Sequence, residues 1–186
     1  MHWTVKALTS AATTAGIWPH THAKRPIMVT ADVALQFERL AVRGDHRDLR
    51  LRIGSYRHSC DSYYLAIDES PTAARSLGAN LARLLEQWST QVDALKGTGG
   101  TAYLPYDFSD QCTAWLRVSS VDGRTAEVQA GWSSIEGWGI EPSNYVATAP
   151  EVTDFAPISN ARIECALTDL TACFGSNRDA LAASGQ

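Results

Sequence analysis

Two carboxylates three positions apart, Asp107 and Asp110, come closest among the side chains of this chain to a catalytic pair. Paired carboxylates can serve as general acid and general base, or they can hold a cation. The sequence around them supplies no third ligand, no histidine and no glycine-rich phosphate loop, so the pair is incomplete for either chemistry. Asp side chains also bond nearby backbone N–H groups, which favours a turn held by Asp107, with Asp110 the better candidate for exposure.

The cysteines and histidines do not form a recognisable site in the sequence. The four cysteines lie far apart without a C-x-x-C motif, and the interval from Cys165 to Cys173 is too wide for a local metal knuckle. We therefore expect free thiols packed as small apolar residues, no metal site and no cofactor. His58 and Cys60 would share one face of a strand without necessarily touching, and we expect no catalytic Cys–His pair there.

Aromatic residues gather in the second half of the chain, with seven of the 16 between Tyr103 and Tyr145. Trp115 is out of phase with Ala114 and Leu116, so its indole is predicted to point outward. An exposed Trp beside acidic groups suits a protein interface or a platform for sugars. The alternative is a second core on that face, covered by a terminal helix. The candidate partner-binding residues, expected on one partly exposed surface, are Tyr106, Asp107, Asp110, Trp115, Trp132, Glu136 and Trp138.

Charge is unevenly distributed along the chain. Residues 1–96 carry 12 Lys and Arg against 9 Asp and Glu, whereas residues 97–186 carry 4 against 11. An acidic surface attracts basic partners, mainly by raising the association rate, and repels phosphates. The net charge of -4 therefore argues against binding to nucleic acid or to an anionic membrane. With 45% hydrophobic and 19% charged residues, the composition is typical of a soluble globular protein, which we expect in the cytoplasm.

The N-terminal residues differ in composition from the rest. Residues 1–31 are rich in Ser, Thr and Ala, and Asp32 is the first acidic residue. We predict a weakly ordered extension over residues 1–31, followed by a single domain over residues 32–175. The stretch from Ala7 to Trp18 is too diluted by polar residues for a signal peptide. Met28 precedes the first patterned segment and is an alternative start of translation.

Three segments with alternating apolar residues, at 33–37, 49–53 and 63–67, are predicted to be strands with one buried face. Gly44-Asp45 and the residues from Tyr56 to Asp61 are the expected connections, which gives an antiparallel meander. Arginines in this region are interrupted by acidic residues. That pattern predicts a charged outer sheet face rather than a nucleic-acid stripe.

A long amphipathic helix is predicted over about residues 71–96. Ser70 suits the N-cap, Pro71 suits the first turn, and Gly97 follows the last patterned residue as a stop signal. Its apolar stripe follows 3 and 4 spacing and holds Leu77, Leu81, Leu84, Leu85, Trp88, Val92 and Leu95. We expect this stripe to pack on a sheet, with a coiled-coil seam as the alternative.

A second group of strands follows the helix. Asp122-Gly123, between the strands Ala114–Val121 and Arg124–Ser133, is a strong signal for a tight hairpin. Pro105 predicts a bend in the strand before it. Ser159 or Asn160 is predicted to cap a short helix that ends near Phe174.

The predicted fold class is therefore α+β: an antiparallel sheet with one long helix packed on a face, plus a short C-terminal helix. Residues 176–186 are predicted to form a frayed tail.

One segment of this pattern resembles a known group of proteins. The chain reads L-P-Y-D-F-S-D-Q over residues 104–111, followed by G-W-S at 131–133, E-G-W at 136–138 and P-S at 142–143. These motifs resemble a group of small bacterial proteins of mostly unassigned function, whose L-P-[YF]-D-F-S-D-Q segment precedes a hairpin. The resemblance covers residues 48–156. It implies a binding role like that of immunity or antitoxin partners of bacterial toxins, and it implies no catalytic residues.

Three functional hypotheses follow. The first is a non-catalytic bacterial binding protein of immunity or antitoxin type, whose acidic aromatic surface binds a protein partner such as a basic toxin. The alternative is a small-ligand or carbohydrate-binding module that uses Trp115, Trp132 or Trp138 for stacking. The third is a hydrolase that uses Asp107 and Asp110.

Overall fold

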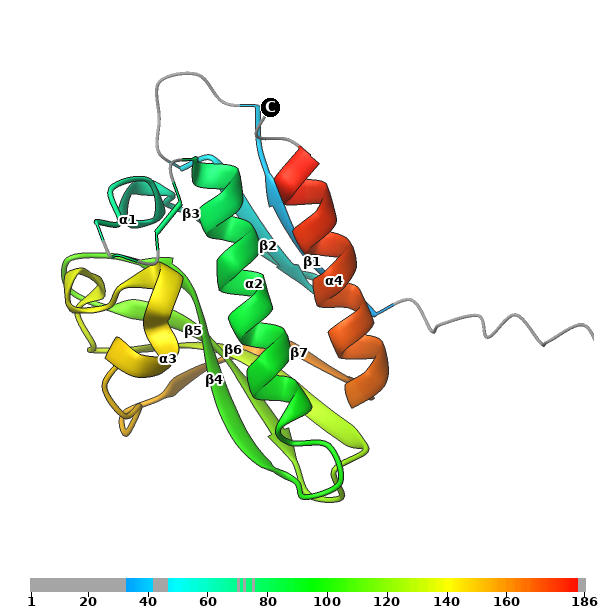
Figure 1. The fold of residues 1–186 in the computed structure, drawn as a ribbon. Coiled ribbons are helices and arrows are strands. Elements are labelled where there is room, and N and C mark those ends of the chain that lie inside the picture. The colour runs from blue at the N-terminus through cyan, green and yellow to red at the C-terminus, as the bar shows by residue number, and fades with distance from the viewer. Residues whose placement is uncertain (1–32, 42–46, 70, 72, 75, 184–186) are drawn as a thin grey trace, which may run out of the picture.

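The computed structural model describes residues 33–41, 47–69, 71, 73–74 and 76–183. Within these ranges the chain forms two antiparallel sheets and two long helices that pack side by side (Figure 1). The extension predicted for residues 1–31 and the connection predicted at Gly44-Asp45 lie outside the described residues. None of the described helices is both long and apolar enough to span a membrane.

The described elements run from strands to helices, back to strands, and end in a helix. In chain order they are β1 (Leu35–Arg39), β2 (Leu49–Ile53), β3 (Tyr56–Cys60), α1 (Tyr63–Ala66), α2 (Leu77–Asp93), β4 (Gly100–Phe108), β5 (Thr113–Ser120), β6 (Thr125–Ser133), η1 (Gly137–Gly139), η2 (Pro142–Asn144), α3 (Tyr145–Thr148), β7 (Ala156–Ala166) and α4 (Leu167–Ala183). The sheets have the orders β1-β2-β3 and β4-β5-β6-β7. The α+β class is confirmed, but the strands form two sheets where the sequence predicted one.

The third strand lies earlier in the chain than predicted. β3 occupies the segment that was expected to be a connection, whereas part of the predicted strand at 63–67 forms the short helix α1. Gly54 explains the difference, because its φ of 56° lies in the left-handed region that favours glycine. The chain therefore reverses directly after β2, and Tyr56 pairs with Ile53.

Helix α2 is shorter at both ends than the predicted range 71–96. Ser76 replaces Ser70 as the N-cap, since its Oγ accepts a hydrogen bond from the Ala79 N–H at 3.3 Å. The Asn80 Oδ1 accepts from the N–H of Ala74 at 2.6 Å, a contact that holds the preceding segment outside the helix. The predicted apolar stripe is confirmed, with Leu81, Leu84, Leu85, Trp88 and Val92 all fully buried.

The C-terminal region departs most from the sequence prediction. Ser159 and Asn160 lie within β7 rather than at a helix start, and α4 is a long helix of 17 residues rather than a short one. Its last turns include residues 176–183 of the predicted tail, and residues 184–186 of that tail lie outside the described residues. Ile163 and Cys165 pair with β6, which otherwise would present an open edge. Their alternation fits a strand, although the same residues also fit a helical period.

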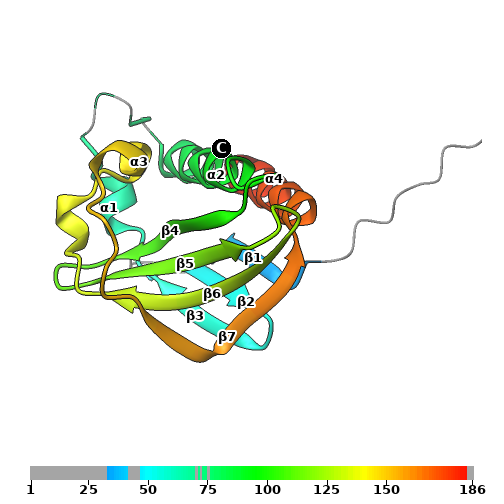
Figure 2. The ribbon, with the colours of Figure 1, turned by 90° about the horizontal axis from the view of Figure 1, so that it is seen from below.

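Trp88 lies where the two sheets and the two long helices meet. Its ring centroid is 5.6 Å from that of Phe37 in β1 and 5.3 Å from that of Phe174 in α4. Its Nε1 donates a hydrogen bond to the carbonyl of Pro105 in β4 at 3.1 Å. Figure 2 shows α2 and α4 along one side of both sheets, so a single core joins all four parts.

The β5–β6 hairpin confirms the prediction made from Asp122-Gly123. Gly123 has a φ of 65°, and the Asp122 Oδ1 accepts the backbone N–H groups of Arg124 and Thr125, both at 2.8 Å. These hydrogen bonds lower the pKa of Asp122 from its ordinary 3.8 to about 2, and the bond from Thr125 has a larger effect than the bond from Arg124. The ionised carboxylate thus fixes the turn.

Asp122→Ala should therefore destabilise the protein at neutral pH and matter less in acid. The pKa is lower in the folded state than in the unfolded state, so the stabilisation is complete above about pH 4 and is lost as the pH falls through about 2. Urea unfolding of both proteins across this range measures the difference. A difference that stays constant down to about pH 2 would contradict this role of the carboxylate.

Candidate functional site

A β-bulge in β4 decides where Asp107 points. Pro105 pairs with Trp115, but the next pair is Asp107 with Ala114, so Tyr106 is an extra residue in the strand. Because side chains alternate between the faces of a strand, the extra residue moves Asp107 onto the face that meets the first sheet. This bulge is the bend that the sequence predicted near Pro105.

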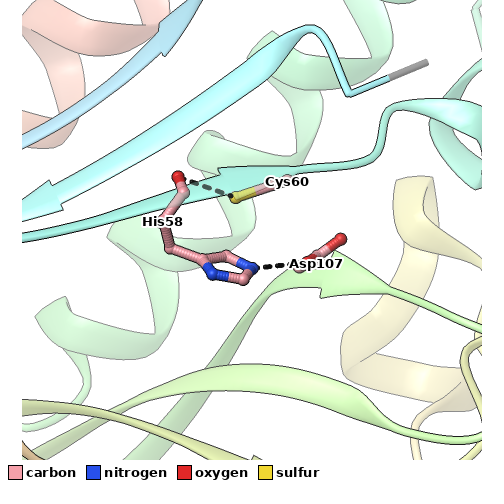
Figure 3. Close-up of side chains that lie close together, drawn as sticks. All are labelled: His58, Cys60 and Asp107. Carbon is pink, nitrogen blue, oxygen red and sulfur yellow. Dashed lines mark hydrogen bonds and ion pairs between the residues drawn. The ribbon is translucent and has the colours of Figure 1, made fainter. Parts of the chain in front are cut away.

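Asp107 bonds to the first sheet and not to its own turn. Its Oδ2 lies 2.8 Å from the Nε2 of His58 in β3 (Figure 3), and its Oδ1 accepts the backbone N–H of Asp61 at 3.0 Å. The prediction of a local turn held by Asp107 is therefore wrong, because both partners come from a distant part of the chain. Ser109 holds the turn instead, since its Oγ contacts the backbone N–H and carbonyl of Cys112.

Aromatic rings fix the imidazole of His58. The ring stacks on Tyr56 with an interplanar angle of 4° and meets Tyr106 and Trp132 edge-on, with centroid distances of 5.9 and 5.3 Å. The His58 side chain remains 22% exposed. The imidazole therefore reaches solvent while its orientation is set by packing.

Cys60 completes a cluster with these two residues. One potential ligand atom from each of His58, Cys60 and Asp107 lies within 4.8 Å of the others. Figure 3 shows the imidazole turned to Asp107 and the sulfur of Cys60 turned to the backbone carbonyl of His58. Burial, followed by the nearby charge of Asp107, raises the pKa of the Cys60 thiol well above its ordinary value. The thiol is therefore protonated at neutral pH and is a poor nucleophile on its own. Sequence reasoning placed His58 and Cys60 on one face but had no signal for Asp107 as their neighbour.

A groove of about 790 Å³ opens over this cluster. His58, Asp107 and Trp132 lie on one side, and Tyr63, Tyr64 and Ile67 of the α1 region lie on another. The Tyr64 hydroxyl donates to the carboxylate of Asp110, and this hydrogen bond is the main cause that raises the pKa of Tyr64 to about 12. Asp110 thus joins α1 to the turn after β4.

The loop that carries Glu136 and Trp138 lies beside the same turn. The Gly137 N–H donates to the Ser109 carbonyl at 2.7 Å, and a Cβ on Gly137 would approach the Ser109 nitrogen to 2.6 Å. Glycine is therefore required for this contact. Five exposed side chains are here called the acidic aromatic rim: Tyr63, Ile67 and Asp110, which line the groove, and Glu136 and Trp138, which flank Gly137.

Comparison of the chain with family models, with curated proteins and with solved structures finds no match. The geometry of the rim and of the groove is therefore the basis for a functional proposal.

The structure divides the predicted site residues into two groups. Asp110, Glu136 and Trp138 are exposed, and Trp132 is half-buried beside His58. Tyr106, Asp107 and Trp115 are buried instead.

The predicted exposure of Trp115 is wrong. Its side chain is only 1% exposed, and its Nε1 donates to the Ser133 Oγ at 2.8 Å. It borders a small hollow with Tyr145 and Val152, so that face carries a second layer of packing, formed by the segment after η2 rather than by the terminal helix. Trp115 cannot serve as a stacking platform in this state.

Proposed function

We propose that this chain is a non-catalytic binding protein of immunity or antitoxin type, which uses the acidic aromatic rim to bind a basic protein partner. The exposure of apolar side chains there carries the proposal: Trp138 is 65% exposed, Ile67 47% and Tyr63 43%. Large exposed apolar side chains that gather in one region and border charged groups are typical of protein interfaces.

The charge around the groove supports a basic partner. The described residues that line the groove include three acidic residues, Asp61, Asp107 and Asp110, and one arginine, Arg47. Glu136 lies on the neighbouring loop. Clustered carboxylates speed association with a positively charged surface. The rim also belongs mainly to the half of the chain in which acidic residues outnumber basic ones.

The carboxylates do not support the hydrolase hypothesis. Asp107 bonds to His58 and Asp61, whereas Asp110 bonds to Tyr64, so each carboxylate has partners of its own. A small-ligand site is the second candidate, because the groove has aromatic walls and the volume of an ordinary ligand pocket. In that case Trp132 would be the stacking side chain.

Trp138→Ala should weaken partner binding by about tenfold or more, roughly 1.4 kcal/mol, without lowering stability. Affinity capture with the wild-type chain, from an extract of the cells that make it, would identify a basic partner, and titration calorimetry would compare the variants. Val121→Ala is the matched control, because Val121 is fully exposed at the other end of the β5–β6 hairpin. We expect that control to bind as the wild type does.

Ionic strength separates the two binding hypotheses. Affinity for a basic protein should fall as salt rises, and Asp110→Asn should reduce that dependence, whereas stacking on a neutral sugar should change little. Equal affinity of the wild type and Trp138→Ala for the captured partner would rule out the rim as the interface.

A further inference from the structure

Three donor atoms of different chemistry converge below the groove. A ring nitrogen of His58, the Sγ of Cys60 and a carboxylate oxygen of Asp107 lie within 4.8 Å of one another. Imidazole, thiolate and carboxylate are the three ligand types that zinc takes in proteins. In a tetrahedral site with bonds of about 2.0 to 2.3 Å, the ligand atoms are about 3 to 4 Å apart, so small side-chain rotations would bring these atoms onto one ion.

We propose that His58, Cys60 and Asp107 bind a divalent transition metal, with zinc as the preferred ion. Cys60 approaches from the buried side, whereas His58 and Asp107 both line the groove. A metal held by these three side chains would have its fourth position directed to the groove, open to water or to a ligand atom. Binding releases the thiol proton to solvent, and the imidazole keeps its remaining proton on the ring nitrogen that does not face Asp107, so the hydrogen bond between His58 and Asp107 gives way to two metal bonds.

The surroundings orient the ligands as a metal site requires. The Asp61 N–H holds one oxygen of Asp107 and leaves the other facing His58. Tyr56 and Trp132 fix the imidazole plane, and the bulge at Tyr106 turns Asp107 inward. Outer contacts of this kind set ligand orientation and contribute to metal affinity.

The positions of the ligands favour a metal over a chance cluster. His58 and Cys60 lie two residues apart in β3, so they share a face of one rigid strand, and Asp107 lies in a second sheet that packs against it. Sites built on strands are more precise than sites on loops. The bulge is the feature that makes the third ligand available, since a regular strand would have turned Asp107 to the other face.

Cobalt spectroscopy on the full chain, freed of metal with a chelator, tests the proposal. Bound Co²⁺ should give a thiolate-to-metal charge-transfer band in the near ultraviolet and strong visible d–d bands, and one equivalent of Zn²⁺ should remove both. Cys60→Ser should abolish the charge-transfer band and weaken Zn²⁺ binding at least about tenfold. Cys112→Ser is the matched control, because Cys112 also lines the groove but lies outside the cluster, and it should keep the wild-type spectrum.

A second variant keeps the test valid if Cys60→Ser fails to fold. His58→Gln changes a partly exposed residue, and it should remain folded while it loses the tetrahedral d–d bands and the rise in Tm that Zn²⁺ gives the wild type. The proposal is overturned if the wild type shows no thiolate band with Co²⁺, if the band survives Cys60→Ser, or if Cys112→Ser removes it. It is independent of the rim, because Trp138→Ala should leave the cobalt spectrum unchanged.

Discussion

Trp88→Ala should lower the free energy of unfolding by about 3 to 5 kcal/mol. The side chain is fully buried and contacts β1, β4 and α4 together, so its removal leaves a cavity that no single element can close. The variant also loses the hydrogen bond from the indole to the Pro105 carbonyl, which leaves a buried acceptor unsatisfied.

Urea unfolding followed by circular dichroism measures this loss, and Trp138→Ala is the matched control. Trp138 is largely exposed, so its removal should change stability by less than about 0.5 kcal/mol. A loss below about 1 kcal/mol for Trp88→Ala would show that the two sheets and the helices do not share one core.

Asp107→Ala should cost about 2 to 3 kcal/mol of unfolding free energy. The change leaves the Asp61 N–H and the imidazole of His58 without their shared acceptor at a partly buried position. Because Asp107 in β4 is hydrogen-bonded to His58 in β3, the loss should appear as weaker packing between the two sheets.

Asp110→Ala is the comparison for this second prediction, since Asp110 is an exposed carboxylate in the same groove. We expect Asp110→Ala to affect partner binding more than stability, and Asp107→Ala to do the reverse. If Asp107→Ala unfolds at the wild-type urea concentration, the bond to His58 does not stabilise the fold.

The sequence predicted correctly those elements that are determined by residues close together in the chain. The β5–β6 hairpin depends on Asp122 and Gly123, two residue types that favour tight turns. The buried stripe of α2 depends on the spacing of apolar residues within one helix. Both were therefore predicted from the sequence. Alternation likewise located β1 and β2. The wrong assignment at Ser159 arose because apolar spacing there fits two periods, and only the need of β6 for a partner strand selects β7.

The candidate site could not be predicted in the same way. His58 and Asp107 meet because two sheets pack together, and no feature within either segment encodes that contact. The bulge at Tyr106 then reverses the face of every residue after it, so alternation counted along β4 points Asp107 in the wrong direction. Exposure of Trp115 failed for a similar reason, since the covering segment near Tyr145 belongs to a later part of the chain.

The position of Trp88 also determines how late in synthesis the core of the protein can fold. Its neighbours Phe37, Pro105 and Phe174 come from widely separated stretches, so the indole stays accessible to solvent and to chaperones until the last of them has been synthesised. Contacts between distant segments slow folding, because the chain loses the entropy of closing long loops before these contacts can stabilise it. The native core around Trp88 can therefore be completed only after α4 has been synthesised and has packed against the other elements.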